Sequence, residues 1–156
     1  MRISYLADRP ELAAQLIPDL LKHWSYIFPN QTAADRAAKF KAHENYDELP
    51  IAWIAHDGDL ALGTAALRKS DLEGREDLSP WLGGVFVSPR HRGRGIASDL
   101  CRAVEAKAHA LGVSRLYLFT HGQESFYDRL GWITLEQVVW HGHGCSIMSK
   151  VPAPKS

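Results

Sequence analysis

Three arginines and two glycines lie between residues 89 and 95, in a turn that links an apolar run to a helical pattern. Residues 81–87 (WLGGVFV) are expected to form a buried strand, and a helix is expected to open near Gly95. Backbone N–H groups at a helix start have no partner within the helix, and the helix dipole adds about half a positive charge there. Glycines let such amides approach an anion closely. We therefore expect a polyphosphate to bind this turn.

Two better-known phosphate loops do not fit this turn. A dinucleotide-binding fingerprint needs a third glycine where Ser98 stands, and an acidic residue at the end of the next strand, where residues 119–121 read Phe-Thr-His. A Walker loop needs Gly-Lys-Ser or Gly-Lys-Thr, which the sequence does not contain. What remains is Arg-x-x-Gly-x-Ala, from Arg92 to Ala97, after a Val-x-Val strand end. A plain turn with solvated arginines is the alternative.

This pattern resembles the acyl-CoA-binding motif of the GCN5-related N-acetyltransferase (GNAT) superfamily. Residues 126–132 (FYDRLGW) are similar to a second marker of that superfamily, Phe-Tyr-x-x-x-Gly-aromatic. The resemblance implies that acetyl-CoA binds as a cosubstrate. It assigns the coenzyme to the turn and to the backbone of the preceding strand: Val85, Val87, Arg92, Gly93, Arg94, Gly95, Ile96, Ala97 and Ser98.

Acetyl transfer to an amine requires a proton donor and a proton acceptor. A neutral tyrosine hydroxyl, with a pKa of about 10, suits a departing thiolate whose own pKa is about 8.5. Tyr127 matches the superfamily tyrosine that commonly acts as this acid, and the Val85 N–H would polarise the thioester carbonyl. Many relatives place a Glu on the fourth strand, but residues 81–87 hold no acid. We expect Asp77 to bind the amine and His121 to accept its proton, with Glu124 or a water chain as substitutes.

The acceptor is expected to be a primary amine with an apolar or ring portion. Acidic residues gather at 71–77, and aromatic residues occur at Trp24, Tyr26, Phe28 and Trp81. We assign Trp24, Asp77 and Trp81 to acceptor binding. A small amine, a drug-like amine and a peptide N-terminus all remain open. Residues 120–127 (THGQESFY) also resemble the actin N-terminal acetyltransferase branch.

Two other functions compete with this prediction. A non-catalytic acyl-CoA sensor would use the same cleft, although the retained Tyr127 argues against it. Nucleic-acid binding would need the basic side chains of Arg90, Arg92, Arg94 and Arg102, but 18 basic residues balance 18 acidic ones, and no stacking surface is evident beside the arginines. No nucleic acid or membrane is therefore expected as a partner.

The elements around these motifs predict an α/β (α+β) fold with a GNAT-like mixed, mostly antiparallel sheet of six to seven strands and about four helices on both faces. The resemblance implies that the sheet splays between its fourth and fifth strands. Gly83 and Gly84 inside the fourth strand mark a bulge or a close backbone approach at this point. Strands are expected at 2–6, 50–55, 61–67, 81–87, 113–120, 132–140 and 145–151. Helices are expected from Pro10 with a break at Pro18, from a Thr32 cap, over 96–111 and over 125–130.

The chain length suits a single N-acetyltransferase domain over residues 1–151, with 152–156 as a C-terminal tail. Cys101 and Cys145 fall in predicted helix and strand, which favours a reducing compartment. No leader-like or membrane-length apolar run occurs, so we expect a cytoplasmic protein that is a monomer or a homodimer. His141, His143 and Cys145 alternate on one strand face, but no further ligand cluster accompanies them, and we expect no metal.

Overall fold

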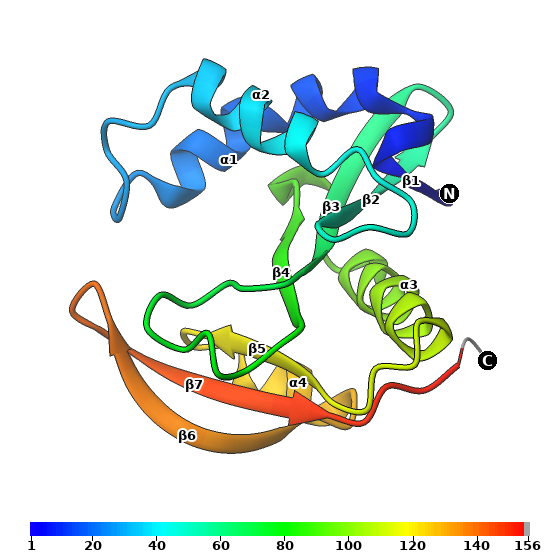
Figure 1. Ribbon diagram of the computed structural model, residues 1–156. Coiled ribbons are helices and arrows are strands. Elements are labelled where there is room, and N and C mark those ends of the chain that lie inside the picture. The colour runs from blue at the N-terminus through cyan, green and yellow to red at the C-terminus, as the bar shows by residue number, and fades with distance from the viewer. Residues whose placement is uncertain (155–156) are drawn as a thin grey trace.

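A computed structural model describes residues 1–154, which contain one seven-stranded mixed sheet (Figure 1). The strand order is β1-β2-β3-β4-β5-β7-β6, and every neighbouring pair is antiparallel except β4 and β5. This confirms the predicted sheet. The strands span Arg2–Tyr5 (β1), Ile51–Asp57 (β2), Leu60–Arg68 (β3), Trp81–Val87 (β4), Leu116–Thr120 (β5), Ile133–Trp140 (β6) and His143–Lys150 (β7).

Helices cover both faces of the sheet, as expected. The α-helices span Ile17–Trp24 (α1), Ala33–Ala42 (α2), Ile96–Ala110 (α3) and Glu124–Arg129 (α4), and short 3₁₀ segments span Leu6–Asp8, Pro10–Leu16 and Pro89–His91. One core packs α3 and Tyr127 against β2–β5, and a second packs the 3₁₀ segments and α1 against the opposite face of β2–β4. The two cysteines, Cys101 and Cys145, are buried and free.

The first helical region changes its winding where the sequence predicts a break. Residues from Pro10 to Leu16 form a 3₁₀ helix, and α1 begins at Ile17 with Pro18 in its first turn. Pro18 has no N–H to donate to the Ala14 carbonyl, so a continuous α-helical ladder cannot pass through it. In the first turn of a new helix that N–H is not needed.

The second helix begins at the predicted cap. The Thr32 hydroxyl accepts a hydrogen bond from the Asp35 N–H at 3.1 Å, and the Asp35 carboxylate accepts one from the Thr32 N–H at 2.9 Å. This reciprocal arrangement satisfies two otherwise unpaired amides. It fixes the start of α2, and with it the position of the basic side chains that this helix carries.

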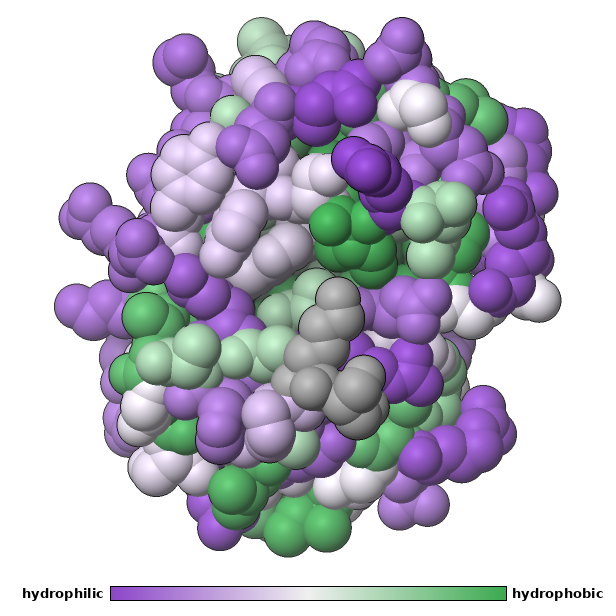
Figure 2. Space-filling view, turned by 90° about the vertical axis from the view of Figure 1, so that its right-hand side faces the viewer, coloured by the Kyte–Doolittle hydropathy of each residue, from purple (hydrophilic) through white to green (hydrophobic). Residues whose placement is uncertain are grey.

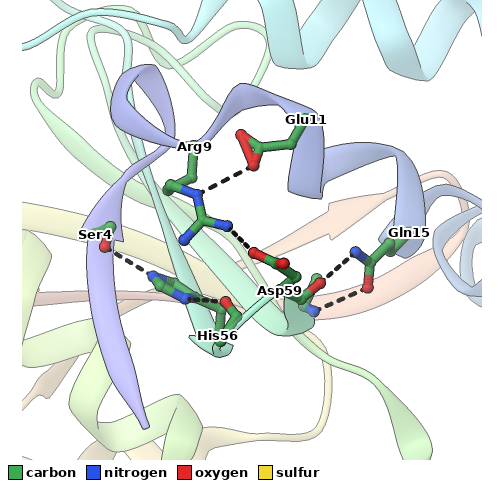
Figure 3. Close-up of polar contacts among 8 residues, drawn as sticks. Ser4, Arg9, Glu11, Gln15, His56 and Asp59 are labelled. Carbon is green, nitrogen blue, oxygen red and sulfur yellow. Dashed lines mark hydrogen bonds and ion pairs between the residues drawn. The ribbon is translucent and has the colours of Figure 1, made fainter.

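Polar contacts attach the first 3₁₀ segments to the β2–β3 turn (Figure 3). Arg9 pairs with Asp59 at 2.5 Å, and the Gln15 amide donates to the Asp59 carbonyl at 2.7 Å. On β2, the Nδ1–H of His56 donates to the Gly58 carbonyl, so its Nε2 atom accepts from the Ser4 hydroxyl at 2.8 Å. These bonds tie the 3₁₀ segment that leads into α1 to the β2–β3 turn.

A bulge in β4 precedes the point where the sheet opens. Pairing with β3 runs Thr64 to Phe86 and then jumps to Ala66 with Gly83, which leaves two β4 residues between the paired positions. Gly84 in this bulge has φ +60°, a conformation that disfavours residues with a Cβ atom. Pairing between β4 and β5 is confined to Trp81 with Tyr117. In Figure 1, β4 rises through the centre while β5, β7 and β6 run across the bottom, so the predicted splay is confirmed.

The start of the predicted tail packs against α3. Pro152 is buried, and the Ala153 N–H donates to the Glu105 carboxylate at 2.9 Å. Residues 155–156 lie outside the described residues. Figure 2 looks onto the side where α3 and both chain ends lie, and it shows hydrophilic residues interspersed with hydrophobic ones. Among residues 1–154, no helix has both the length and the apolar character needed to span a bilayer.

Candidate active site

A cleft of about 470 Å³ lies where β4 leaves β5, between the bulge, the start of α3 and α4. It brings together the two sequence motifs, because the turn before α3 forms one wall and Tyr127 forms another. All of the residues predicted to hold the coenzyme line it except Arg94. The complete lining is His23, Val85, Phe86, Val87, His91, Arg92, Gly93, Gly95, Ile96, Ala97, Ser98, Gln123, Phe126 and Tyr127.

The backbone amides of the turn are available to a ligand. Gly93 and Gly95 have φ values of +78° and +76°, which curl the chain at the start of α3. The hydrogen bonds on either side are His91 N–H to Ser88 and Asp99 N–H to Gly95. Within residues 1–154, the amides from 92 to 98 donate to no protein acceptor. Together with the helix dipole, these unpaired donors give the cleft wall a positive potential that would suit an anion.

The arginines of the turn take different directions. Arg92 lies at the cleft, where its Nε–H donates to the Val87 carbonyl at 3.0 Å. Arg94 lies outside the lining, because its guanidinium reaches Asp57 at 3.4 Å and donates to His91 Nδ1 at 3.3 Å. The structure therefore places Arg92 beside the anion surface and turns Arg94 toward the β2–β3 hairpin.

Tyr127 points its reactive group at the cleft from a fixed backbone. Its carbonyl accepts hydrogen bonds from Leu130 at 2.9 Å and Trp132 at 3.1 Å, which sets the turn after α4. The residue is 9% exposed, and its hydroxyl forms no hydrogen bond with another described residue. Burial raises the pKa of Tyr127, with smaller effects from Cys101 and Asp71, so the hydroxyl is protonated at neutral pH. The hydroxyl is therefore neutral and has no hydrogen-bond partner among the described residues.

His23 lines the same cleft, and the sequence motifs do not single it out. Its ring lies 5.3 Å from that of Phe86. Partial burial lowers the pKa of His23, and the positive charges of Arg92 and Arg36 lower it further. The aromatic stretch that begins at residue 23 was the available signal, since a loop this rich in rings suggests a pocket wall.

Asp77 and Trp81 do not reach the cleft. Asp77 is exposed, its carboxylate bonds the Arg75 guanidinium at 3.1 Å, and Arg75 also pairs with Glu136 on β6. Hydrogen bonds from Arg75 lower the pKa of Asp77. Trp81 is fully buried, and its Nε1–H donates to the Leu78 carbonyl at 2.6 Å. These contacts leave Trp81 without a free surface for an acceptor.

The end of α1 and the aromatic loop that follows it pack on the β6–β7 hairpin, and the His121 ring lies against the same hairpin. The ring of Trp24 lies 5.9 Å from Trp140, and that of Tyr26 lies 5.3 Å from His143. His121 is exposed, stands 5.1 Å from His143, and donates through Nδ1–H to the Gly144 carbonyl at 2.7 Å. In this tautomer its Nε2 atom can accept a hydrogen bond.

A carboxylate that the motifs did not single out lies at the β4 bulge. A Cβ atom built on Gly83 would stand 2.8 Å from Asp71 Oδ2, so this side chain covers the strand directly. Arg68 holds it, with Nη1 at 2.7 Å from Asp71 Oδ1. The acidic character of residues 71–77 was visible in the sequence. Which of these acids faces β4 depends on how the loop packs against that strand, which the sequence does not show.

Comparison with known proteins agrees with this geometry. Among solved structures, the chain is similar to an aminoglycoside 6'-N-acetyltransferase complexed with coenzyme A (18% identity, TM-score 0.75, covering 100% of this chain and 99% of that one). The aminoglycoside 6'-N-acetyltransferase from Enterococcus faecium gives 18% identity and a TM-score of 0.72, with 100% and 99% covered. A putative acetyltransferase from Salmonella typhimurium with acetyl-CoA gives 14% and 0.70, with 100% and 96% covered.

These structures share the fold at low sequence identity. The model of the acetyltransferase (GNAT) family matches residues 14–132, from the end of the first 3₁₀ helices to the aromatic residue after α4. Both sequence motifs and the whole cleft wall fall within that span. The chain therefore belongs to the GNAT family of acetyltransferases.

Proposed function

We propose that the protein transfers the acetyl group of acetyl-CoA to a primary amine of a small molecule. The observation that carries this proposal is the meeting of two features in one cleft: unpaired backbone amides at 92–98 and the free hydroxyl of Tyr127. The first suits a diphosphate, and the second suits a thiol leaving group.

The residues of the cleft fit the coenzyme. The amides from Arg92 to Ser98 would hold its diphosphate at the start of α3, because donors with no protein partner can bind an anion without breaking a hydrogen bond within the protein. The backbone of β4 beside the opening, at Val85 and Val87, would bond the pantetheine arm. Acetyl-CoA supplies an activated acetyl thioester, and the protein supplies its placement and the proton transfers.

The reaction needs the amine in its neutral form and a proton for the sulfur. The amine nitrogen forms a bond to the acetyl carbonyl carbon while the carbon–sulfur bond breaks. Tyr127 donates its proton to the sulfur and is reprotonated from solvent through the cleft. The Val85 N–H would stabilise negative charge on the carbonyl oxygen.

The amine side involves different residues from the acid side. Asp71 would bind the amine, because Arg68 holds its carboxylate at the bulge. It replaces Asp77, the acid expected from the sequence, whose carboxylate pairs with Arg75. His121 remains our proposed proton acceptor, acting through water from the β6–β7 side, because its Nε2 atom is free to accept. Trp24 would contribute an apolar wall to the acceptor.

A small-molecule acceptor is favoured by the neighbours. Two of the similar structures are, by their descriptions, aminoglycoside acetyltransferases, which act on small amines. The aromatic side chains of residues 24–28 pack against the β6–β7 hairpin, so this end of the site is enclosed by the chain itself.

Two measurements test the proposal. Calorimetry with coenzyme A should show one site, and thiol release with acetyl-CoA over an amine panel should show turnover. Tyr127→Phe should lower kcat by about 100-fold with little change in coenzyme affinity. Tyr117→Phe is the control: Tyr117 lies on the face of β5 away from Tyr127, and its loss of a hydroxyl should leave kcat unchanged. Coenzyme binding without thiol release from any amine would favour a sensor, and absence of coenzyme binding would overturn the proposal altogether.

A further inference from the structure

A second, smaller cavity of about 30 Å³ lies on the α1–α2 side of the β4 bulge. It adjoins the coenzyme cleft, because sequence neighbours line the two spaces. Gly84 and Trp24 line the small cavity, and Val85 and His23 line the cleft. The side chains around it come from α1, α2 and β2–β4: Leu20, Trp24, Arg36, Lys39, Phe40, His43, Ala52, Thr64, Ala66, Arg68 and Gly84.

Arg36 brings a buried positive charge to this cavity without an acidic partner. The residue is 8% exposed, and its Nε–H donates to the neutral Gln31 side chain at 2.9 Å. Among the described residues no carboxylate lies within ion-pair distance of it. Buried arginines are normally paired, because removing a charge from water is costly unless an opposite charge compensates. The cavity is therefore short of negative charge.

Arg68 adds a second guanidinium, and its neighbours supply only one acid. Its Nη1 bonds Asp71 at 2.7 Å, while its Nε–H donates to His43 Nε2 at 3.0 Å. His43 Nδ1–H donates in turn to the Lys39 carbonyl at 2.7 Å, so the imidazole is neutral. Burial and the Arg68 charge lower the pKa of His43 to about 4. The histidine thus orients Arg68 and changes no charge near neutral pH.

Lys39 places a third cation at the rim. It too has no carboxylate partner within ion-pair distance among residues 1–154. Burial of its ammonium group, followed by the charges of Arg68 and Arg36, lowers its pKa to about 8, against a smaller opposing effect of Asp71. At pH 7 three cations surround the cavity, from Arg36, Lys39 and Arg68, against the single carboxylate of Asp71.

We infer that this cavity binds an anionic group of the acceptor, so that the acceptor is an amine carrying a carboxylate or a similarly small anion. The inference rests on the proposed function and narrows its substrate class. Asp71 at the bulge would attract the ammonium end, and the guanidinium of Arg36 would bind the anion through its planar fork. A polycationic amine would meet like charges here and is disfavoured.

Thiol release from matched amines tests the inference. The series contains an α-amino acid, its carboxamide, the same amine without the carboxyl group, the corresponding aminophosphonic acid and an aminoglycoside. The amino acid should exceed its amide in kcat/KM by at least about 10-fold, and Arg36→Gln should reduce this ratio by about 10-fold, toward equal rates. Arg36→Lys should restore part of it. Lys39→Gln, at the exposed rim, should reduce it as well, and Arg102→Gln, on exposed α3 outside both cavities, should leave it unchanged.

Each outcome decides the question. Preference for the phosphonate over the carboxylate would keep the anion site and change the anion. Equal rates for acid and amide, or faster transfer to the aminoglycoside, would overturn the inference while leaving the transferase intact. If no amine releases thiol, the proposed transferase activity fails, and calorimetry with the amino acid and its amide tests the anion site separately. Binding that is selective for the acid, and that is lost in Arg36→Gln, would support the anion site. Equal binding of acid and amide, or no binding of either, would refute it.

Discussion

Arg68 lies directly against Gly84, since a Cβ atom built on Gly84 would come within 2.7 Å of the Arg68 Nη2 atom. The bulge in β4 and the cation beside it therefore share one space. Glycine at this position allows both the φ value of +60° and the close approach of the guanidinium. This contact joins the bulge beside the proposed coenzyme cleft to a cation of the proposed acceptor cavity.

Gly84→Ala should therefore damage acceptor binding and stability together. The left-handed backbone costs about 1–2 kcal/mol for a residue with a Cβ atom, and the new methyl group would also displace Arg68. We expect the free energy of unfolding in urea to fall by at least this amount and the acceptor KM to rise. Gly58→Ala is the matched control, because Gly58 has φ +55° and no atom within 4 Å of its built Cβ. An unchanged acceptor KM in Gly84→Ala would contradict the coupling.

Gly95→Ala should weaken coenzyme binding more than it weakens the fold. Gly95 is the N-cap residue just before α3 and Gly112 lies just beyond its end, with φ values of +76° and +79° and open space beside both. Either alanine variant should lose about 1–2 kcal/mol of stability from backbone strain. Only Gly95→Ala reshapes the amides at 92–98, so calorimetry should show weaker coenzyme A binding in this variant alone. Similar coenzyme affinities in the two variants would argue against an anion site at this turn.

The parts of the site that the sequence predicts are local in the chain. The turn from Arg92 to Ser98 and the Tyr127 segment each form within one strand–turn–helix or helix–turn unit, where residue type and spacing determine the backbone. Gly83 and Gly84 likewise mark the bulge, because few other residues adopt its conformation. These features could be placed before any tertiary contact was known.

The acceptor side depends on partners far away in sequence. Asp71 and Asp77 lie in the same acidic loop, and the residue types do not tell which of them faces the bulge. In the fold, Asp71 covers Gly83, whereas Asp77 pairs with Arg75, which also contacts Glu136 on β6. Trp81 has the residue type of a pocket wall, but packing against Ile147 buries it. Arg36 sits on an amphipathic helix whose burial becomes visible only after the helix docks. Tertiary packing determines which of these side chains reach the site, and local sequence patterns do not show that packing.

Acid should destabilise the fold through His43. Its pKa falls from the model-peptide value of 6.5 to about 4 in the folded state, where burial and Arg68 oppose protonation. Between these values the unfolded chain binds more protons, so stability declines as pH drops from 6.5 to 4 and levels off below. The loss should reach about 3 kcal/mol. Urea unfolding across this pH range measures the loss of stability. The plot of unfolding free energy against pH should flatten in His43→Gln. It should keep its slope in His141→Gln, whose histidine lies on the exposed hairpin. A wild-type curve no steeper than that of His43→Gln would exclude this residue as the cause.

Alkaline pH should weaken the anion site through Lys39. Its ammonium faces Arg36 on its own helix, Arg68 on β3, Asp71 beyond β3 and the neutral His43, and its pKa is lowered to about 8. Lys39 is charged below this pH and loses its attraction for an anion above it. A simple carboxylate that competes with the acceptor should therefore show a Ki that rises by about 2- to 5-fold between pH 7 and 9, the size expected for one partly exposed ion pair. In Lys39→Arg the charge persists and the Ki should stay level, while a rise of equal size in that variant would place the titration elsewhere.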